Sequence, residues 1–229
     1  MKPYQKVPIE DCGESLVSIP LESFSVVSPH PYEVLGAPYE DRSPYFLREG
    51  VLLKLLQAQT ALQAQYPGWQ LQIFDAYRPI AVQQFMVDHT FAQLAAEKGI
   101  AVETMSEDMR SRIHSEVLKF WAIPSPNPNT PPPHSTGAAV DLTLADATGK
   151  AVDMGSPIDE ISPRSYPNHF EACADPAEQK AHQHRNLLAS VMVGVGFRQH
   201  PNEWWHFSAG DQLWAWQVGD GTTAYYGGA

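Results

Sequence analysis

The chain has 229 residues, 43% of them hydrophobic, so it is long enough to bury a full core, and a single domain over 1–229 is expected. Its 15 basic and 26 acidic residues give a net charge of -11. This balance argues against a nucleic-acid or anionic-membrane surface, because phosphate binding draws on clustered lysine and arginine.

The sequence shows no targeting signal and few cysteines. No stretch reaches the roughly 18 apolar residues of a membrane span, and the first residues carry no apolar signal segment, so a cytoplasmic location is expected. The two cysteines, Cys12 and Cys173, are too few for a disulfide framework or a cysteine-based zinc site, and free thiols are expected.

Residues 1–48 are rich in proline, serine and tyrosine and show no sustained hydrophobic period, which predicts an irregular N-terminal part. Short strands are expected at 15–19 and 24–27. His30 lies between two prolines, and we expect it in an exposed loop. Residues 49–218 are then predicted to form the core of the domain.

Three helices are predicted from apolar spacing and from their end signals. The first is predicted from Arg48 to Tyr66, where Pro-Gly ends it. An alternating strand then ends at Asp75. The second helix starts at Pro79, where a missing N–H does no harm, and runs to about 98. The third is expected over 107–121.

The proline-rich stretch 124–133 is interpreted as a stiff loop that carries the chain to His134, because polyproline geometry fixes the position of the residue after it. A separate linker between domains is the alternative. Asp141 then lies inside an apolar run that predicts a buried strand.

The C-terminal part is predicted to contain one helix over 175–193, with an aspartate N-cap and then a proline. The segments 203–208 and 212–218 are predicted to be strands that form a hairpin. The tail at 225–228 is expected to be frayed.

Two distant stretches carry the polar residues of most interest. His134 and Asp141 are seven positions apart, and Glu203 and His206 are three apart. A carboxylate inside an apolar run is costly to desolvate unless it is paired or binds a metal. Two imidazoles and one carboxylate suit a borderline ion such as zinc and leave a fourth place for water, with Glu203 free to act as a base.

Each pair alone is weak evidence. A loop histidine and an aspartate paired with an arginine remain the plain alternatives, and the joint occurrence of the two pairs is what favours a metal site. Because side chains three apart face opposite sides of a flat strand, a bend is expected between Glu203 and His206.

Four segments, at 75–79, 134–144, 154–159 and 203–207, resemble the zinc-dependent D-alanyl-D-alanine dipeptidases of the VanX type, in that family's order and with similar spacing. The resemblance implies an α+β fold with a central, mostly antiparallel sheet flanked by helices and a single zinc site. It also implies hydrolysis of D-alanyl-D-alanine or similar short D,D-dipeptides into free amino acids. The process it suggests is cell-wall biogenesis or degradation, and the physiological role stays open between cell-wall recycling, nutrition and antibiotic resistance.

The resemblance further implies a role for individual side chains. His134, Asp141 and His206 match the ligands of one Zn²⁺ per chain. Glu203 matches the catalytic base that activates the zinc-bound water.

Residues for the substrate are implied in the same way. Arg78 matches the arginine that stabilises the oxygen of the tetrahedral intermediate, and Asp159 matches the carboxylate that receives the substrate ammonium. Without the resemblance, a salt bridge at a helix start and a turn residue would be the preferred interpretations. Asp75 and Tyr77, which flank the arginine, are expected to support it and to line the pocket.

The sequence departs from the family at two places. Pro132 and Pro133 stand where small hydroxyl residues commonly precede the first zinc histidine and help to bind the dipeptide. The N-terminal third also lacks the family's usual Tyr-Ala and Asn-Phe stretch. Because of these two departures, the identity of the dipeptide substrate stays open.

Three alternative functions remain. They are a related zinc D,D- or L,D-carboxypeptidase acting on longer peptidoglycan peptides, a non-catalytic zinc-binding module, and a plain structural domain. The expected partner is a small dipeptide, and the sequence leaves homo-oligomerisation open.

Overall fold

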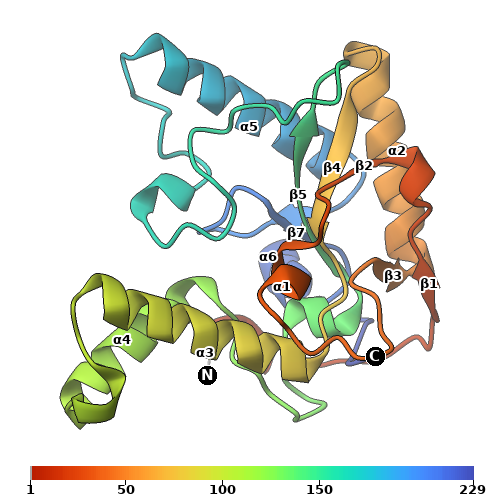
Figure 1. Cartoon of the computed structure of the whole chain (residues 1–229). Helices are drawn as coiled ribbons and strands as arrows, with labels where there is room; N and C mark the ends of the chain where they lie inside the picture. Colours follow the sequence, from red (N-terminus) through yellow and green to blue (C-terminus); the bar gives the residue numbers. More distant parts are fainter. Residues whose placement is uncertain (1) are drawn as a thin grey trace.

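The structure, a computed structural model, describes residues 2–229. Its centre is a five-stranded sheet in the order β2-β4-β5-β7-β6 (Figure 1). The β2/β4 pair is parallel and the other three pairs are antiparallel, which confirms the predicted, mostly antiparallel α+β architecture. The strands are β2 (Ser25–Val26), β4 (Gln70–Asp75), β5 (Ala139–Ala145), β6 (Arg198–Gln199) and β7 (His206–Ser208), and a separate pair is β1 (Leu16–Ser18) with β3 (Phe46–Arg48).

Helices flank the sheet. The α-helices are α1 (Pro31–Val34), α2 (Glu49–Gln65), α3 (Ile80–Glu97), α4 (Glu107–Phe120), α5 (Pro176–Gly194) and α6 (Gln212–Val218). Short 3-10 helices are η1 (Pro3–Lys6), η2 (Leu21–Ser23), η3 (Val102–Thr104), η4 (Pro133–Thr136) and η5 (Pro163–Ser165). Among residues 2–229, no helix combines the length and apolar character needed to cross a lipid bilayer.

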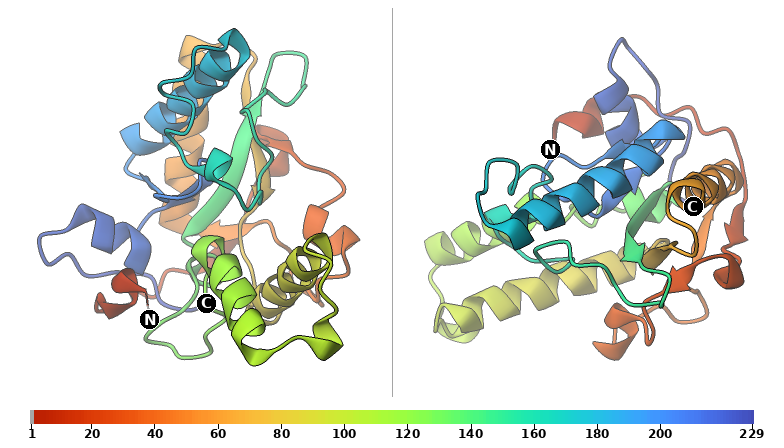
Figure 2. Two further views of the ribbon diagram at one scale, coloured as in Figure 1. Left: turned by 90° about the vertical axis from the view of Figure 1, so that its left-hand side faces the viewer. Right: turned by 90° about the horizontal axis from the view of Figure 1, so that it is seen from above.

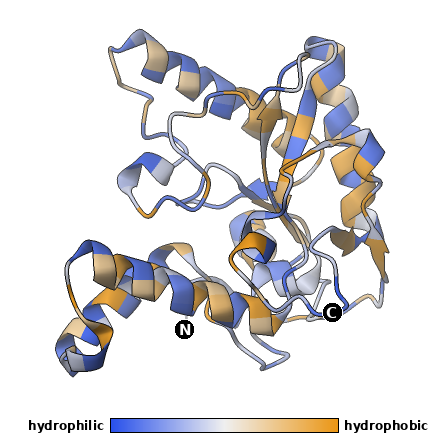
Figure 3. Ribbon diagram, in the orientation of Figure 1, coloured by the Kyte–Doolittle hydropathy of each residue, from blue (hydrophilic) through white to orange (hydrophobic). Residues whose placement is uncertain are grey.

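The main hydrophobic core lies between the sheet and the adjacent helices α2 and α5 (Figure 2). Leu71 and Ile73 of β4 and Leu142 and Leu144 of β5 point into this core and are fully buried. Figure 3 shows the polar and apolar residues that alternate along β4, as expected for a strand with only one face in the core.

A second hydrophobic cluster stands apart from the first and joins α3 and α4 to the segment around α1. Val82 and Val87 of α3 and Ile113 of α4 belong to it. Tyr32 and Trp121 belong to it as well, and the Tyr32 ring lies 5.7 Å from the ring of Phe74 in β4. This cluster therefore places the aromatic rings of Tyr32 and Trp121 close to the sheet.

The predicted helices are confirmed within one or two residues at each end. Ser106 caps α4 by accepting a hydrogen bond from the backbone of Met109 at 3.3 Å. Asp175 caps α5 through the backbone N–H groups of Ala177 and Glu178. Local signals were sufficient here, because each helix has its own start and stop residues.

The predicted hairpin of 203–208 and 212–218 is wrong. Asp211 accepts a hydrogen bond from the backbone N–H of Trp214 at 2.8 Å and so starts helix α6 over the second segment. Strand β7 pairs with β5 and β6 instead. The aromatic composition that suggested a strand reflects packing of this helix, not a sheet.

The expectation of a frayed tail is also wrong. Tyr226 is only 3% exposed, and its hydroxyl donates a hydrogen bond to Glu14 at 2.7 Å. The backbone N–H groups of Tyr225 and Tyr226 both donate to the carbonyl of Gly210. The tail therefore closes over the turn between β7 and α6.

Gly210→Ala should destabilise the fold more than Gly149→Ala. Both glycines have positive φ, which costs an L-residue about 1–2 kcal/mol. A Cβ on Gly210 would also lie 2.4 Å from the Tyr225 ring, whereas nothing lies within 4 Å at Gly149. Overpacking adds about 1–3 kcal/mol, so urea denaturation should separate the two variants by that amount. Equal losses in free energy of unfolding would contradict the described packing of the tail.

Candidate metal centre and active site

Three neighbouring strands bring charged side chains into one row. In the sheet register Asp75 of β4 stands opposite Asp141 of β5, which stands opposite His206 of β7. Opposite residues in an antiparallel pair share a face. This face is the one turned away from α2 and α5, because Leu142, the neighbour of Asp141, points into the core.

A β-bulge is required to place Asp75 in this row. Regular alternation would leave Asp75 on the same face as Ile73, in the core. The register shifts between these two residues, so one extra residue of β4, Phe74, is accommodated there. The extra residue turns Asp75 to the opposite face, beside Asp141.

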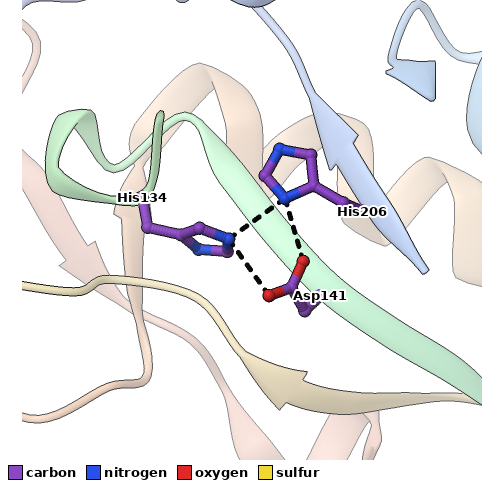
Figure 4. Close-up of side chains that lie close together, drawn as sticks. All are labelled: His134, Asp141 and His206. Atoms are coloured by element: carbon purple, nitrogen blue, oxygen red, sulfur yellow. Dashed lines mark hydrogen bonds and ion pairs between the residues drawn. The ribbon is translucent and has the colours of Figure 1, made fainter. Parts of the chain in front are cut away.

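His134 completes a cluster with Asp141 and His206, as Figure 4 shows. The Nε2 atom of His134 lies 3.1 Å from Asp141 Oδ2 and 3.1 Å from His206 Nδ1, and that Nδ1 lies 2.9 Å from Asp141 Oδ1. Tetrahedral ligands about 2.1 Å from a zinc ion would be roughly 3.4 Å apart. The two imidazole nitrogens and the two carboxylate oxygens of Asp141 therefore stand near the spacing that one shared cation requires.

The outer nitrogens of the imidazoles fix their orientation. His134 Nδ1 lies 2.6 Å from the carbonyl oxygen of Ala76, which can only accept, so Nδ1 carries the hydrogen and Nε2 presents a lone pair. With His206 bound through Nδ1, its Nε2–H faces the Ser208 hydroxyl at 3.2 Å. Two lone pairs then converge beside the carboxylate, an arrangement that a cation stabilises.

Asp141 is the charged centre of this cluster. Its side chain is buried within a strand in which every residue is buried. Burial alone would raise the pKa of this carboxyl, but His134 and His206 hold it well below its usual value. The charged form of Asp141 is therefore the one available to a metal ion.

Glu203 lies beside the cluster, outside the strand that carries His206. The chain bends between the two residues, which confirms the expected bend. Glu203 Oε2 is 3.9 Å from His206 Nδ1, and Oε1 is 3.2 Å from His200 Nδ1. Before a cation binds, burial and the nearby charge of Asp141 raise the pKa of Glu203 well above its usual value.

Arg78 is held by hydrogen bonds on each of its nitrogens. Asp75 Oδ2 accepts from Nε at 3.0 Å and from Nη2 at 2.7 Å, and Gln83 accepts from Nη1 at 2.9 Å. The guanidinium also lies 5.0 Å from the ring centroids of both Tyr32 and Trp121. Nη2 also donates to the Tyr32 hydroxyl and to Asp141 Oδ2, each at 3.3 Å, so Arg78 borders the metal cluster in a fixed orientation.

Asp159 reaches the same pocket from a separate loop. Its backbone has a φ of 65°, in the left-handed region that costs a non-glycine residue energy. The Tyr32 hydroxyl donates to its carboxylate at 2.7 Å. Desolvation, together with the charge of Asp141, raises the pKa of Asp159 to about 7, against the opposing effect of Arg78.

One pocket brings six of the predicted residues together. Its lining includes the three residues of the metal cluster, Glu203, Arg78 and Asp159. Asp75 and Tyr77 do not line this pocket in the part of the chain that the structure describes.

Asp75 lies behind Arg78 and accepts two hydrogen bonds from it, so the expectation that Asp75 lines the pocket is corrected. The Tyr77 side chain turns away, because the chain leaves the sheet after Asp75, and its hydroxyl donates to the carbonyl of Ala229 at 2.8 Å. The expectation that Tyr77 lines the pocket is therefore corrected.

His30 was expected in an exposed loop, and this expectation is wrong. It is 3% exposed, and its Nε2 lies 3.2 Å from Asp75 Oδ1, an oxygen that also accepts from Tyr39 at 3.0 Å. Sequence reasoning missed this support from the N-terminal part, together with Tyr32 and His200. Their only signal was an aromatic-rich, proline-flanked composition, which does not specify long-range partners.

Known proteins resemble this chain over most of its length. A family profile described as D-ala-D-ala dipeptidase matches residues 25–222. A D-alanyl-D-alanine dipeptidase of Synechocystis is 49% identical over 99% of this chain and 96% of its own length. One from Enterococcus faecium is 32% identical over 69% of this chain and 70% of its own. A solved vancomycin-resistance D,D-pentapeptidase with Zn(II) is 17% identical, covers 72% of each chain and has a TM-score of 0.44.

The cluster predicts that Zn²⁺ stabilises the protein. Free zinc at about 100 times its dissociation constant should add about 2.7 kcal/mol, which raises the melting temperature by roughly 5–10 °C. Asp141→Asn should abolish most of this shift in a thermal melt. His114→Ala, which changes an exposed histidine of α4, is the control and should keep it. An unchanged shift in the Asp141 variant would exclude the cluster as the zinc site.

Proposed function

The chain belongs to the D-alanyl-D-alanine dipeptidase family of metallopeptidases, and we propose that it hydrolyses D-alanyl-D-alanine or a similar short D,D-dipeptide into free amino acids. The observation that carries the proposal is the convergence of Glu203 on the cluster of His134, Asp141 and His206 in one pocket. A structural metal site would need no such buried base beside it.

The residues present fit one zinc ion per chain. His134, Asp141 and His206 would hold it, because they offer two imidazole nitrogens and a carboxylate oxygen within 4.8 Å of one another. Bound zinc supplies a water of lowered pKa and polarises the substrate carbonyl. The remaining chemistry belongs to the side chains around the cluster.

Glu203 is proposed to move the proton. Among the described residues, its Oε1 has no hydrogen-bond partner although it is buried, so it is free to accept a proton from the attacking water. The carboxyl group can then donate that proton to the leaving amine. His200, buried at 3.2 Å from the same oxygen, restricts the orientation of the carboxyl group.

Arg78 and Asp159 are proposed to orient the dipeptide. Arg78 borders the cluster with a guanidinium fixed by Asp75 and by two aromatic rings, so it can stabilise negative charge on the carbonyl oxygen without reorganisation. Asp159 offers a carboxylate for the free amino group, and its hydrogen bond from Tyr32 fixes it in place. An enzyme that binds a free amine in this way rejects peptides whose amino end is blocked or extended.

Glu203→Gln should keep zinc and lose turnover. The amide preserves the shape of the side chain but cannot accept the proton, so kcat for D-alanyl-D-alanine should fall by roughly 100- to 10,000-fold. Metal content by elemental analysis should stay at one zinc per chain. Glu171→Gln removes an exposed carboxylate and serves as the control. Near-normal turnover of the Glu203 variant would rule out its proposed role as base.

Asp159→Asn should weaken binding of the amino end. Loss of the charged contact should raise KM for D-alanyl-D-alanine by roughly 10- to 100-fold. The wild-type enzyme should leave N-acetyl-D-alanyl-D-alanine intact, because a blocked amine cannot pair with the carboxylate. Faster cleavage of the acetylated peptide than of the free dipeptide would instead indicate a carboxypeptidase.

A further inference from the structure

The segment that begins at Lys2 is held by hydrogen bonds and packing beside the pocket of the metal cluster. The backbone N–H of Lys2 donates to Gln5 Oε1 at 2.8 Å, which closes the short helix η1. Helix η1 packs against α6, as Figure 2 shows near the label N. Gln212 of α6 donates to the carbonyl of Val7 at 2.6 Å. These contacts fix the position from which the side chain of Lys2 extends.

The Lys2 side chain reaches the pocket that holds the metal cluster. Lys2 and Tyr4 both line it, together with Glu203 and Pro133. The ammonium donates to the carbonyl oxygen of Trp121 at 3.1 Å. This is its one hydrogen bond within residues 2–229, and an ammonium has three donors. Two donors are therefore available to a ligand in the pocket.

Charge in the pocket is distributed unevenly. Arg78 and Lys2 are the two lysine or arginine side chains among its described lining residues. The guanidinium of Arg78 already contacts Asp75, Gln83 and Asp141. Lys2 is thus the cation with capacity for a further anion.

A dipeptide brings both a charged amine and a charged carboxylate into this pocket. If Asp159 takes the amine, the carboxylate at the other end needs a donor. The two residues directly before His134 cannot supply one, because Pro132 and Pro133 have neither a hydroxyl nor a backbone N–H. An ammonium group can take the place of this missing donor, because it makes a charge-assisted hydrogen bond to the carboxylate.

We propose that Lys2 binds the C-terminal carboxylate of the dipeptide and so makes the enzyme selective for a free carboxyl end. This inference rests on the proposed function and adds a specificity-determining residue from a part of the chain that is distant from the family's motifs. Asp159 and Lys2 then recognise the two charged ends of one substrate, with the cluster between them.

Two variants of Lys2 and one matched control test the proposal. Lys2→Met keeps the length of the side chain and removes its charge, and Lys2→Arg keeps the charge. Lys6→Met makes the same change at an exposed position of the same helix, η1. Each untagged, zinc-loaded enzyme is assayed on D-alanyl-D-alanine and on its C-terminal amide, and kcat and KM are measured separately.

The expected result is selective. Lys2→Met should raise KM for the free acid by roughly 10- to 100-fold and change KM for the amide by less than about threefold, so the preference for the acid collapses. Lys2→Arg should retain most of this preference, and Lys6→Met should match the wild type.

Other outcomes overturn the inference. Equal losses on both substrates would mean that Lys2 only holds η1 in place, and a gain on both would mean that it obstructs the pocket. A wild-type enzyme that cleaves the acid and the amide equally well also contradicts the inference. A wild-type enzyme that cleaves neither peptide refutes the proposed function itself, which distinguishes the two failures.

Discussion

The charge of Asp141 is the constraint around which the molecule is arranged. A carboxylate in the middle of a fully buried strand is unstable unless opposite charge or hydrogen-bond donors surround it. His134 and His206 approach it from two sides and Arg78 from a third. Each of these side chains is in turn held by a buried partner, so the compensation of one charge organises several distant segments.

Arg78 links this centre to the rest of the fold. Burial alone would lower its pKa, but Tyr32, Asp75 and Asp141 raise it well above the usual value. A guanidinium that stays charged beside two neighbouring aromatic rings cannot change its orientation easily. The second hydrophobic cluster, which supplies those rings, thereby contributes directly to the geometry of the pocket.

Local patterns in the sequence were sufficient to predict the helices and to identify the residues of the metal cluster. The apolar spacing of α2 and the cap of α4 depend on neighbouring residues, so they could be recognised without the fold. The motifs around His134 and Glu203 predicted which residues would meet. They did not predict how, because the position of Asp75 depends on a bulge that a regular alternating pattern conceals.

Two of the errors, those at His30 and Tyr226, share one physical cause. His30 and Tyr226 were assigned to exposed segments because nothing adjacent in the sequence marks their partners, Asp75 and Glu14, which are 45 and 212 positions away. The same holds for Lys2, whose contact with Trp121 spans 119 positions. Long-range contacts of single polar side chains leave no periodic signal.

The support of Asp75 by His30 and Tyr39 bears on what the smallest working enzyme can be. Residues 49–218 contain every side chain that matches a motif, yet a fragment cut at those limits would lack both donors to Asp75 Oδ1. It would also lack Tyr32, which orients Asp159 and covers one face of Arg78. The irregular first fifth of the chain therefore supports the geometry of the pocket, and attempts to shorten the protein should begin elsewhere.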